Sequence, residues 1–189
     1  MGDSVVSGYV YHFIRPNMLG DVLYPLNVLK SVYPNVYEKH AEKYIGREGL
    51  MEVVIPYLDV KWNDVLHLSP ISPVKIRQAM LDEGFEVFNK LRYVKIPVED
   101  LSEGSTVLYK YNRRQSLMDS YREGVDISDD FEMFSVDTYN ELLECPDAYV
   151  QYLKEMKRMG VERPFTHVCI PHILTADSIN ISSYQIFNL

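Results

Sequence analysis

The stretch WNDVLHLSPISP, residues 62–73, carries the clearest structural signal in the chain. Its extended run 64–68 is typical of a strand, and two Ser-Pro pairs follow, which end strand pairing because proline has no backbone N–H. Ser72 and Pro73 suit the N-cap and first turn of a helix that we expect to end just before Gly84. The stretch therefore predicts a strand, a turn and a helix in direct succession.

A second informative run, GYVYHFI at residues 8–14, predicts the first strand. Side chains alternate along a strand, which places His12 on the face opposite Tyr11. Pro16 ends the strand and leaves Arg15 at its end, where binding sites often lie. If the His12 face is closed by packing, this histidine is an ordinary core residue. If the face opens at Arg15 onto the turn at Ser69, it is one wall of a nucleotide cleft.

The rest of the chain supplies further helices and strands. We expect helices after Pro25, over 34–45, from Ser135 to Leu143 and from Pro146 to Met159, and strands over Leu91–Val98, Ser105–Tyr111, Phe165–Ile173 and Ile179–Phe187. Residues 50–58 fit a buried strand or a helix equally, and residues 115–131 fit a loop or an edge. These elements predict one α+β domain over residues 1–189, with a mostly antiparallel sheet and helices in two blocks, after the first strand and before the last two.

Composition and charge limit the class of protein. The 189 residues are 47% hydrophobic and 24% charged, which is typical of a soluble globular protein. No apolar run approaches the roughly 20 residues of a membrane span, and residues 1–8 do not fit a signal peptide, so we expect a cytoplasmic protein without a membrane partner. The net charge of −8 and the lack of a large basic cluster argue against a broad surface for duplex nucleic acid.

Several standard functional motifs are absent from the sequence. The chain contains no GxxxxGK[ST], GxGxxG, GxSxG or HExxH, which removes support for P-loop, Rossmann, α/β-hydrolase and zincin chemistry. Cys145 and Cys169 lie far apart without metal-ligand spacing, and we expect both to be reduced. His167 and His172 are five residues apart, which in a strand puts them on opposite faces. We therefore expect no metal site.

The polar residues of the stretch 62–73 allow two interpretations. Asn63 stands where the strand begins, and His67 and Ser69 share one face of it. One interpretation is a buried strand whose ends are capped by polar side chains. The other is a ligand cleft with Ser69 and the following turn as its wall.

The order of these motifs resembles a known family. Tyr11-His12 on a first strand, two helical segments and then a strand running into LHLSPISP are similar to the layout of the DNA-thymidine ADP-ribosyltransferase toxins and, more broadly, of the ADP-ribosyltransferase superfamily. The resemblance covers residues up to about 70. It implies NAD as co-substrate, with His12 holding NAD and Ser69 near the nicotinamide. Arg15 would meet a phosphate, and Asn63 and His67 would line the same cleft.

The family also implies a catalytic glutamate on a late strand. The late runs FTHVCIPHI and INISSYQIF contain none, so Glu132 in DDFEMF is the first candidate and Glu99 in IPVED the second. A carboxylate fixed beneath the ribose would stabilise the positive charge that develops as the nicotinamide bond breaks.

A non-catalytic function is the alternative. Fifteen tyrosines are many for a chain of this length, and tyrosine offers both contact area and a hydroxyl group. They fit a module whose tyrosine-rich face binds a small ligand or a protein partner. The segments WNDVLHLSP and PHIL are also similar to parts of small uncharacterised bacterial proteins, a likeness that implies no activity.

Overall fold

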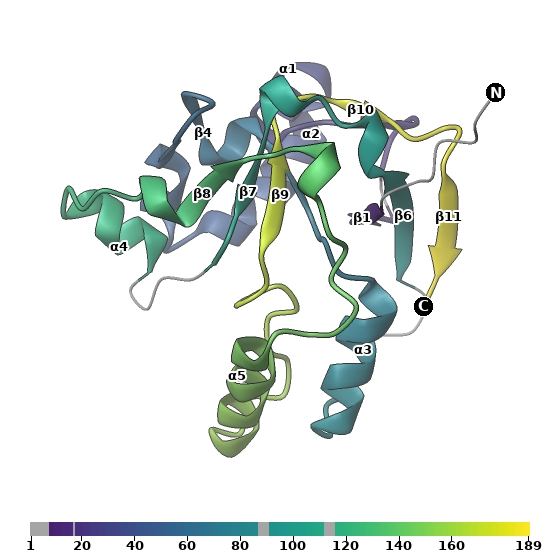
Figure 1. Cartoon of the computed structure of the whole chain (residues 1–189), viewed down its shortest axis with the longest axis vertical. Helices are drawn as coiled ribbons and strands as arrows, with labels where there is room; N and C mark the ends of the chain where they lie inside the picture. The colour runs from purple at the N-terminus through teal and green to yellow at the C-terminus, as the bar shows by residue number, and fades with distance from the viewer. Residues whose placement is uncertain (1–7, 17, 87–90, 112–115) are drawn as a thin grey trace.

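Antiparallel sheets form the centre of the protein, whose computed structural model describes residues 8–16, 18–86, 91–111 and 116–189 (Figure 1). One sheet has the strand order β1-β6-β11 and another the order β5-β9-β7-β8. The strands of these two sheets are β1 (Tyr9–Ile14), β5 (Leu66–Leu68), β6 (Arg92–Pro97), β7 (Thr106–Tyr109), β8 (Phe131–Met133), β9 (His172–Thr175) and β11 (Gln185–Asn188). Two-stranded pairs join β2 (Val22–Leu23) to β10 (Ile179–Asn180) and β3 (Val54–Ile55) to β4 (Val60–Lys61).

A single bridge between Tyr11 and Ser69 connects the two larger sheets. The Tyr11 amide donates to the Ser69 carbonyl at 2.9 Å, and the Ser69 amide donates to the Tyr11 carbonyl at 2.8 Å. Pairing does not continue to the next residues that would bond, because the Ile71 amide donates to the Ser69 hydroxyl and the Tyr9 amide donates to the Glu141 carboxylate. The bridge makes β1 and β5 neighbours, and it brings the strand that carries His12 beside the strand that carries His67.

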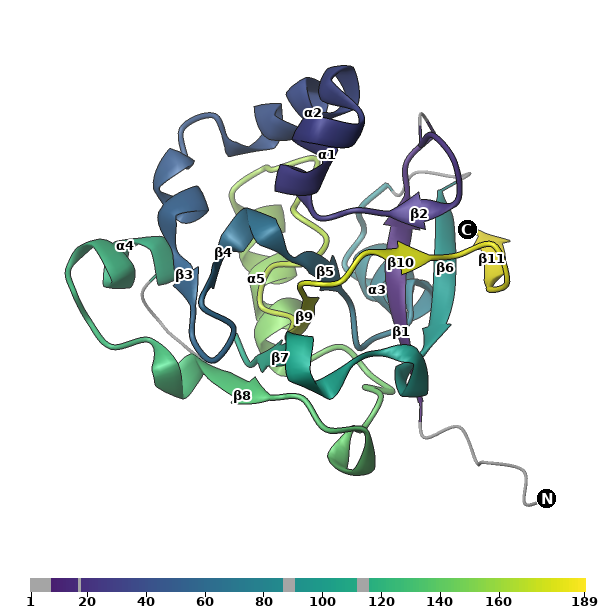
Figure 2. The same ribbon diagram turned by 90° about the horizontal axis from the view of Figure 1, so that it is seen from above.

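The helices pack on the sheets in separate groups. They are α1 (Leu26–Val32), α2 (Pro34–Ala41), α3 (Pro73–Asp82), α4 (Leu117–Arg122) and α5 (Asp147–Arg158). Helices α1 and α2 stack together beside β2, as Figure 2 shows. Helices α3 and α5 lie side by side at the far end of the molecule, where Ile76 and Met80 share a buried cluster with Tyr149 and Leu153 (Figure 1).

The expected α+β class with antiparallel sheets is confirmed by this arrangement. The helix predicted after Ser72 is also observed, beginning at Pro73 and ending before Gly84, whose φ of +75° suits glycine. Helix α4 lies where the sequence indicated a loop or an edge, and the Ser116 hydroxyl caps it by accepting from the Asp119 amide at 3.1 Å.

The prediction of a helix from Ser135 to Leu143 is wrong. Only a single 3₁₀ turn forms, at Val136–Thr138, and the chain then runs extended. Tertiary hydrogen bonds hold it so: the Leu142 amide donates to the Pro70 carbonyl at 2.9 Å, and the Glu141 carboxylate accepts from the Tyr11 hydroxyl at 2.6 Å. These long-range contacts override the local helix preference.

Several expected strands are shorter in the structure. Residues 62–64 form a 3₁₀ turn in which the Asp64 carboxylate accepts from the Lys61 amide at 2.9 Å, so β5 begins only at Leu66. The strand expected at Phe165–Ile173 begins at His172, because turns and a positive φ at Cys169 (+59°) precede it. The last strand is divided into β10 and β11 by a turn at 181–184.

Candidate functional site

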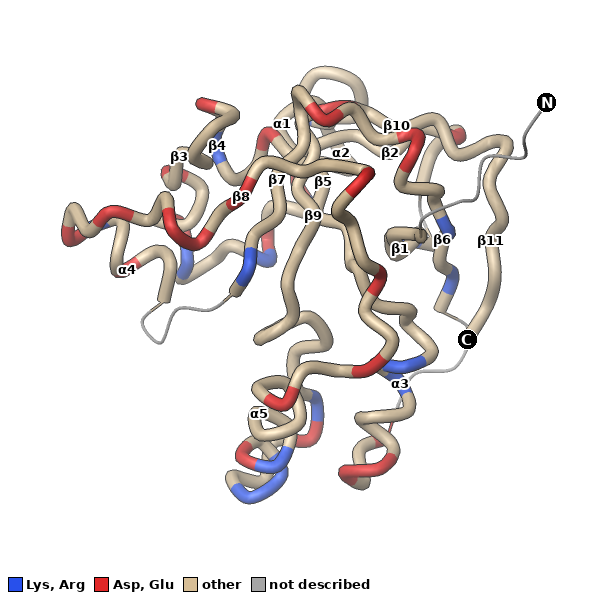
Figure 3. The backbone as a smooth tube through the Cα atoms, in the orientation of Figure 1, with Lys and Arg blue, Asp and Glu red and all other residues tan. Residues whose placement is uncertain are grey.

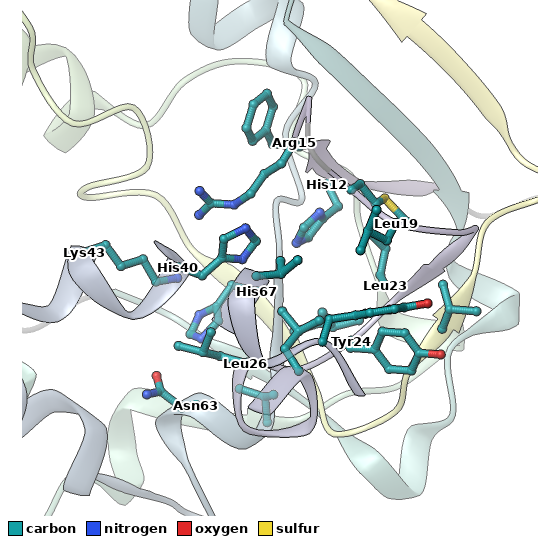
Figure 4. Close-up of a pocket in the computed structure, with 18 of the residues that line it drawn as sticks. His12, Arg15, Leu19, Leu23, Tyr24, Leu26, His40, Lys43, Asn63 and His67 are labelled. Atoms are coloured by element: carbon teal, nitrogen blue, oxygen red, sulfur yellow. The ribbon is translucent and has the colours of Figure 1, made fainter. Parts of the chain in front are cut away.

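A pocket opens between β1, β5, helices α1 and α2 and the turn that follows β1 (Figure 4). Its volume is about 140 Å³. Three histidines from three separate elements line it, together with Arg15, Lys43 and Asn63. The three are His12 of β1, His40 of α2 and His67 of β5. We call this site the histidine pocket.

The end of β1 places Arg15 at the pocket. Pro16 follows it, and the Arg15 carbonyl accepts from the Met18 amide at 3.0 Å, which turns the chain back over the pocket. Figure 4 shows the Arg15 side chain extending toward His40 and Lys43. Among the described residues, no carboxylate forms an ion pair with this guanidinium group.

Helix α2 supplies the opposite wall. Pro34 disfavours helical geometry at Tyr33, which ends α1 and starts α2 with a change of direction. Val36 and His40 of α2, Tyr33 at its N-cap and Lys43 in the 3₁₀ turn that follows it (Glu42–Tyr44) are spaced by three or four residues, and all four line the pocket. This spacing keeps them on one helical face.

The remaining walls are mainly apolar and aromatic. Leu23, Leu26 and Val65 line the pocket from the core side, and the rings of Tyr24 and Tyr44 add to it. The Lys43 ammonium lies 4.8 Å from the centre of the Tyr44 ring. A ligand here would meet charge and hydrogen-bonding groups at one end and apolar or aromatic surface at the other, which is the usual composition of a small-molecule site.

Three buried polar atoms of the pocket have no hydrogen-bond partner among the described residues. They are Nδ1 of His12, Nε2 of His40 and Oδ1 of Asn63. By contrast, Nε2 of His67 lies 3.1 Å from the Trp62 carbonyl oxygen. Buried polar groups are nearly always paired, so three unpaired atoms on residues that line one cavity are an unusual concentration of unsatisfied polar groups.

Burial keeps the pocket histidines neutral at pH 7. Burial first, and then the nearby charges of Lys43 and Arg15, lower the pKa of both His12 and His40 to about 4. The pKa of His67 is lowered well below its usual 6.5, again first by burial and then by His172 and Lys43.

Lys43 and Arg15 carry the positive charge of the pocket. Although Lys43 is exposed as a whole residue, burial of its ammonium group against Tyr44, with Arg15 and Arg47 nearby, lowers its pKa to about 8. No Asp or Glu is among the described residues that line the pocket. Acidic residues gather elsewhere, notably along the part of the chain that holds α4 and β8 (Figure 3).

The other two histidines lie beside the pocket. The ring centres of His67 and His172 are 6.1 Å apart, and those of His172 and His167 are 6.4 Å apart. The expectation that His167 and His172 point to opposite faces of one strand is wrong, because His167 lies in the turns before β9. Within the described part of the chain, no group of three or more His, Cys, Asp or Glu residues is arranged to hold a metal ion.

The structure brings four of the expected site residues together: His12, Arg15, Asn63 and His67 all line the histidine pocket. His12 lies on the same face of β1 as the core residues Val10 and Ile14. The pocket that it lines is bounded by α1 and α2 and does not include the turn at Ser69.

Ser69, Glu132 and Glu99 lie elsewhere. The Ser69 hydroxyl donates to the Ile71 carbonyl at 2.9 Å and accepts from the Ile71 amide at 3.2 Å, so it stabilises the turn. Glu132 is exposed on β8, the outermost strand of its sheet, opposite Leu108 of β7. Glu99 lies in a 3₁₀ turn after β6. None of the three lines the pocket.

Sequence reasoning did not identify His40 and Lys43 as site residues. His40 fitted the edge of an apolar helix stripe, which is a common place for a structural histidine. The missed signal is the continuation of that stripe: with the spacing 33, 36, 40 and 43, its last two positions are basic. An apolar face that ends in a histidine and a lysine indicates a cavity with a charged end.

Compared with models of protein families, with curated proteins and with solved structures, the chain shows no match. No helix in the described ranges has the length and apolar character that crossing a membrane requires. The fold and the site therefore define the protein as an α+β protein with a cationic, histidine-lined pocket.

Proposed function

We propose that the protein binds a small phosphorylated molecule of the nucleotide type in the histidine pocket, with NAD and its ADP-ribose part as the first candidates. The observation that carries this proposal is the meeting of Arg15, Lys43 and three histidines in one cavity without a lining carboxylate among the described residues. Cationic side chains without acidic partners select anionic ligands.

The chemistry of the groups favours phosphate in particular. An arginine guanidinium can donate two parallel hydrogen bonds to a phosphate, and lysine adds a compact positive charge. The unpaired nitrogens of His12 and His40 offer further bonds once they carry a proton. The Tyr24 and Tyr44 rings offer contact surface for a base or a nicotinamide.

The size of the pocket limits how the ligand lies. Sites that enclose a whole drug-sized ligand usually measure about 300–1,000 Å³. The 140 Å³ of the histidine pocket is smaller, so it encloses one end of such a ligand and leaves the rest toward solvent. A sugar phosphate or one half of a dinucleotide has the appropriate size.

ADP-ribosyl transfer is a second candidate function. This function is favoured because His12 and Arg15 line one pocket beside β5. The resemblance to the ADP-ribosyltransferases implies that these two residues hold NAD in a common cleft. Against it, the positive charge that develops on the ribose would face Arg15 and Lys43 without a lining carboxylate from the described residues to stabilise it. We therefore infer binding without transfer.

Thermal unfolding with added ligand tests the proposal. ADP-ribose and NAD at millimolar concentration should raise the Tm, whereas adenosine, which lacks phosphate, should not. Arg15→Gln should remove the shift, and Arg92→Gln, a change at an exposed arginine of β6 outside the pocket, should preserve it. No shift with either phosphorylated ligand, or an equal shift with adenosine, would overturn the proposal. Release of nicotinamide from NAD would favour the transferase instead.

A further inference from the structure

We propose that the histidine pocket takes up protons together with its ligand, so that His12 and His40 enter the complex as positively charged donors to a phosphate group. This inference rests on the proposed function and names its regulation by pH. It follows from which groups surround each histidine and from what an anion would change.

The surroundings of His12 contain cations and neutral rings. Lys43, His167 and Arg15 act on it electrostatically, and each of them opposes a positive charge on the ring. The backbone carbonyl of Phe13 acts in the opposite direction and favours the charged ring, but its effect is smaller than that of burial. Its Nδ1 atom is buried without a hydrogen-bond partner among the described residues.

His40 has the same kind of environment on the opposite wall. Arg15 and Lys43 are the charged groups that act on it, and both disfavour protonation. Its Nε2 atom is buried and has no partner among the described residues. Figure 4 shows the His40 ring between Arg15 and His67, facing the space that the ligand would occupy.

His67 is held differently from the other two. His172, Lys43 and His12 act on it as positive or potentially positive groups, while the Trp62 carbonyl binds its Nε2 at 3.1 Å. One ring nitrogen is therefore already used. His67 is less suited to change its protonation on ligand binding, and we assign the uptake to His12 and His40.

An anion in the pocket reverses the electrostatic balance. Before binding, a protonated ring would be buried beside Arg15 and Lys43, so the histidines stay neutral at pH 7. A phosphate group placed among these side chains brings negative charge, which favours the charged form of each ring within about 4–6 Å. The unpaired ring nitrogens then become N–H donors to phosphate oxygens, and the added protons come from the buffer.

The linkage has a definite sign. If binding raises the pKa of a histidine, affinity increases as the pH falls through the pKa of the complex. Each proton taken up increases affinity by about tenfold per pH unit within that range. ADP-ribose is a suitable probe because its pyrophosphate charge does not change in the range where histidine titrates, around pH 6–7.

Titration calorimetry with ADP-ribose in two buffers of different ionisation enthalpy measures the uptake directly. The wild-type protein should take up about one proton or more per ligand near pH 6.5, and the affinity should rise as the pH is lowered from about 7 to about 6, a range in which Lys43, with a pKa of about 8, is already charged. The variant His40→Gln should take up fewer protons on binding, and the double variant that carries both His12→Gln and His40→Gln should take up none. Lys39→Gln, an exposed change on the same helix, is the matched control and should take up protons as the wild type does.

The outcomes separate the two proposals. Binding of ADP-ribose without proton uptake would overturn this inference and leave the proposed function intact. No binding at any pH would overturn the proposed function itself. Uptake that persists in the double variant would exclude His12 and His40 as the groups involved. If His12→Gln does not fold, His40→Gln alone still decides the question, because its half-exposed side chain is carried by a surface helix.

Discussion

Acidification below pH 6.5 should destabilise this protein steeply, because it buries several neutral histidines. Burial lowers the pKa of His12, His40, His167 and His172 from the usual 6.5 to about 4 in each case. Above pH 6.5 these rings are neutral in both the folded and the unfolded chain. Between pH 6.5 and about 4 the unfolded chain binds protons that the folded protein excludes, so the free energy of unfolding falls with pH.

The size of this effect follows from the number of rings. One proton bound only by the unfolded chain lowers the free energy of unfolding by about 1.4 kcal/mol per pH unit. With His67, whose pKa is also lowered well below 6.5, five histidines give at most about 7 kcal/mol per pH unit, and we expect about half of this because the rings are only half-buried and interact with one another. A domain with a total stability of about 5–15 kcal/mol would lose much of it by about pH 5.

Urea unfolding at about pH 7, about pH 6 and about pH 5.5 measures the slope. His167→Gln removes one ring outside the pocket and should reduce the slope, whereas the exposed change Lys39→Gln should leave it unchanged. A slope below about 1 kcal/mol per pH unit would contradict this prediction, because it would mean that fewer than one histidine remains neutral in the folded state.

Three further predictions concern single side chains. Arg15→Gln should weaken binding of ADP-ribose by about tenfold to a hundredfold, measured by calorimetry, because a charge-assisted hydrogen bond contributes about 1.5–3 kcal/mol. Tyr11→Phe should lower the free energy of unfolding in urea by about 1.5–3 kcal/mol without changing affinity, since it removes the 2.6 Å bond to the Glu141 carboxylate outside the pocket. Ser69→Ala should cost about 1–3 kcal/mol of stability through its bonds to the Ile71 backbone and leave affinity unchanged; a loss of affinity alone would show that Ser69 contacts the ligand.

The sequence predicted correctly a helix whose ends are marked by residues with a strong local preference, such as serine, proline and glycine. The helix after Ser72 is bounded by a serine at the N-cap position, a proline and a glycine, and it forms within one residue of the expected ends. The segment from Ser135 carries a similar cap, yet it runs extended because Leu142 and Glu141 bond to distant parts of the chain. Long-range pairing of this kind leaves no local signature in a sequence.

The candidate site divides in the same way. Strand alternation predicted that His12 lies on the face opposite Tyr11, and the proline after Arg15 predicted that Arg15 lies at the strand end. Both residues line the pocket. Adjacency to a Ser-Pro turn also suggested Ser69, but a serine hydroxyl beside a proline turn bonds readily to nearby backbone, as it does here. His40 of α2 and Lys43 of the 3₁₀ turn after it line the same pocket as His12 of β1, an arrangement that only the three-dimensional structure shows.

Phosphate recognition by the histidine pocket is tested most directly by a calorimetric titration of the wild-type protein with ADP-ribose, with adenosine as the phosphate-free comparison. Such recognition predicts saturable binding of ADP-ribose at one site per chain, no measurable binding of adenosine, and an affinity for ADP-ribose about tenfold to a hundredfold lower in Arg15→Gln. Equal behaviour of the two ligands, or undiminished binding of ADP-ribose by Arg15→Gln, would contradict the claim that the histidine pocket recognises phosphate.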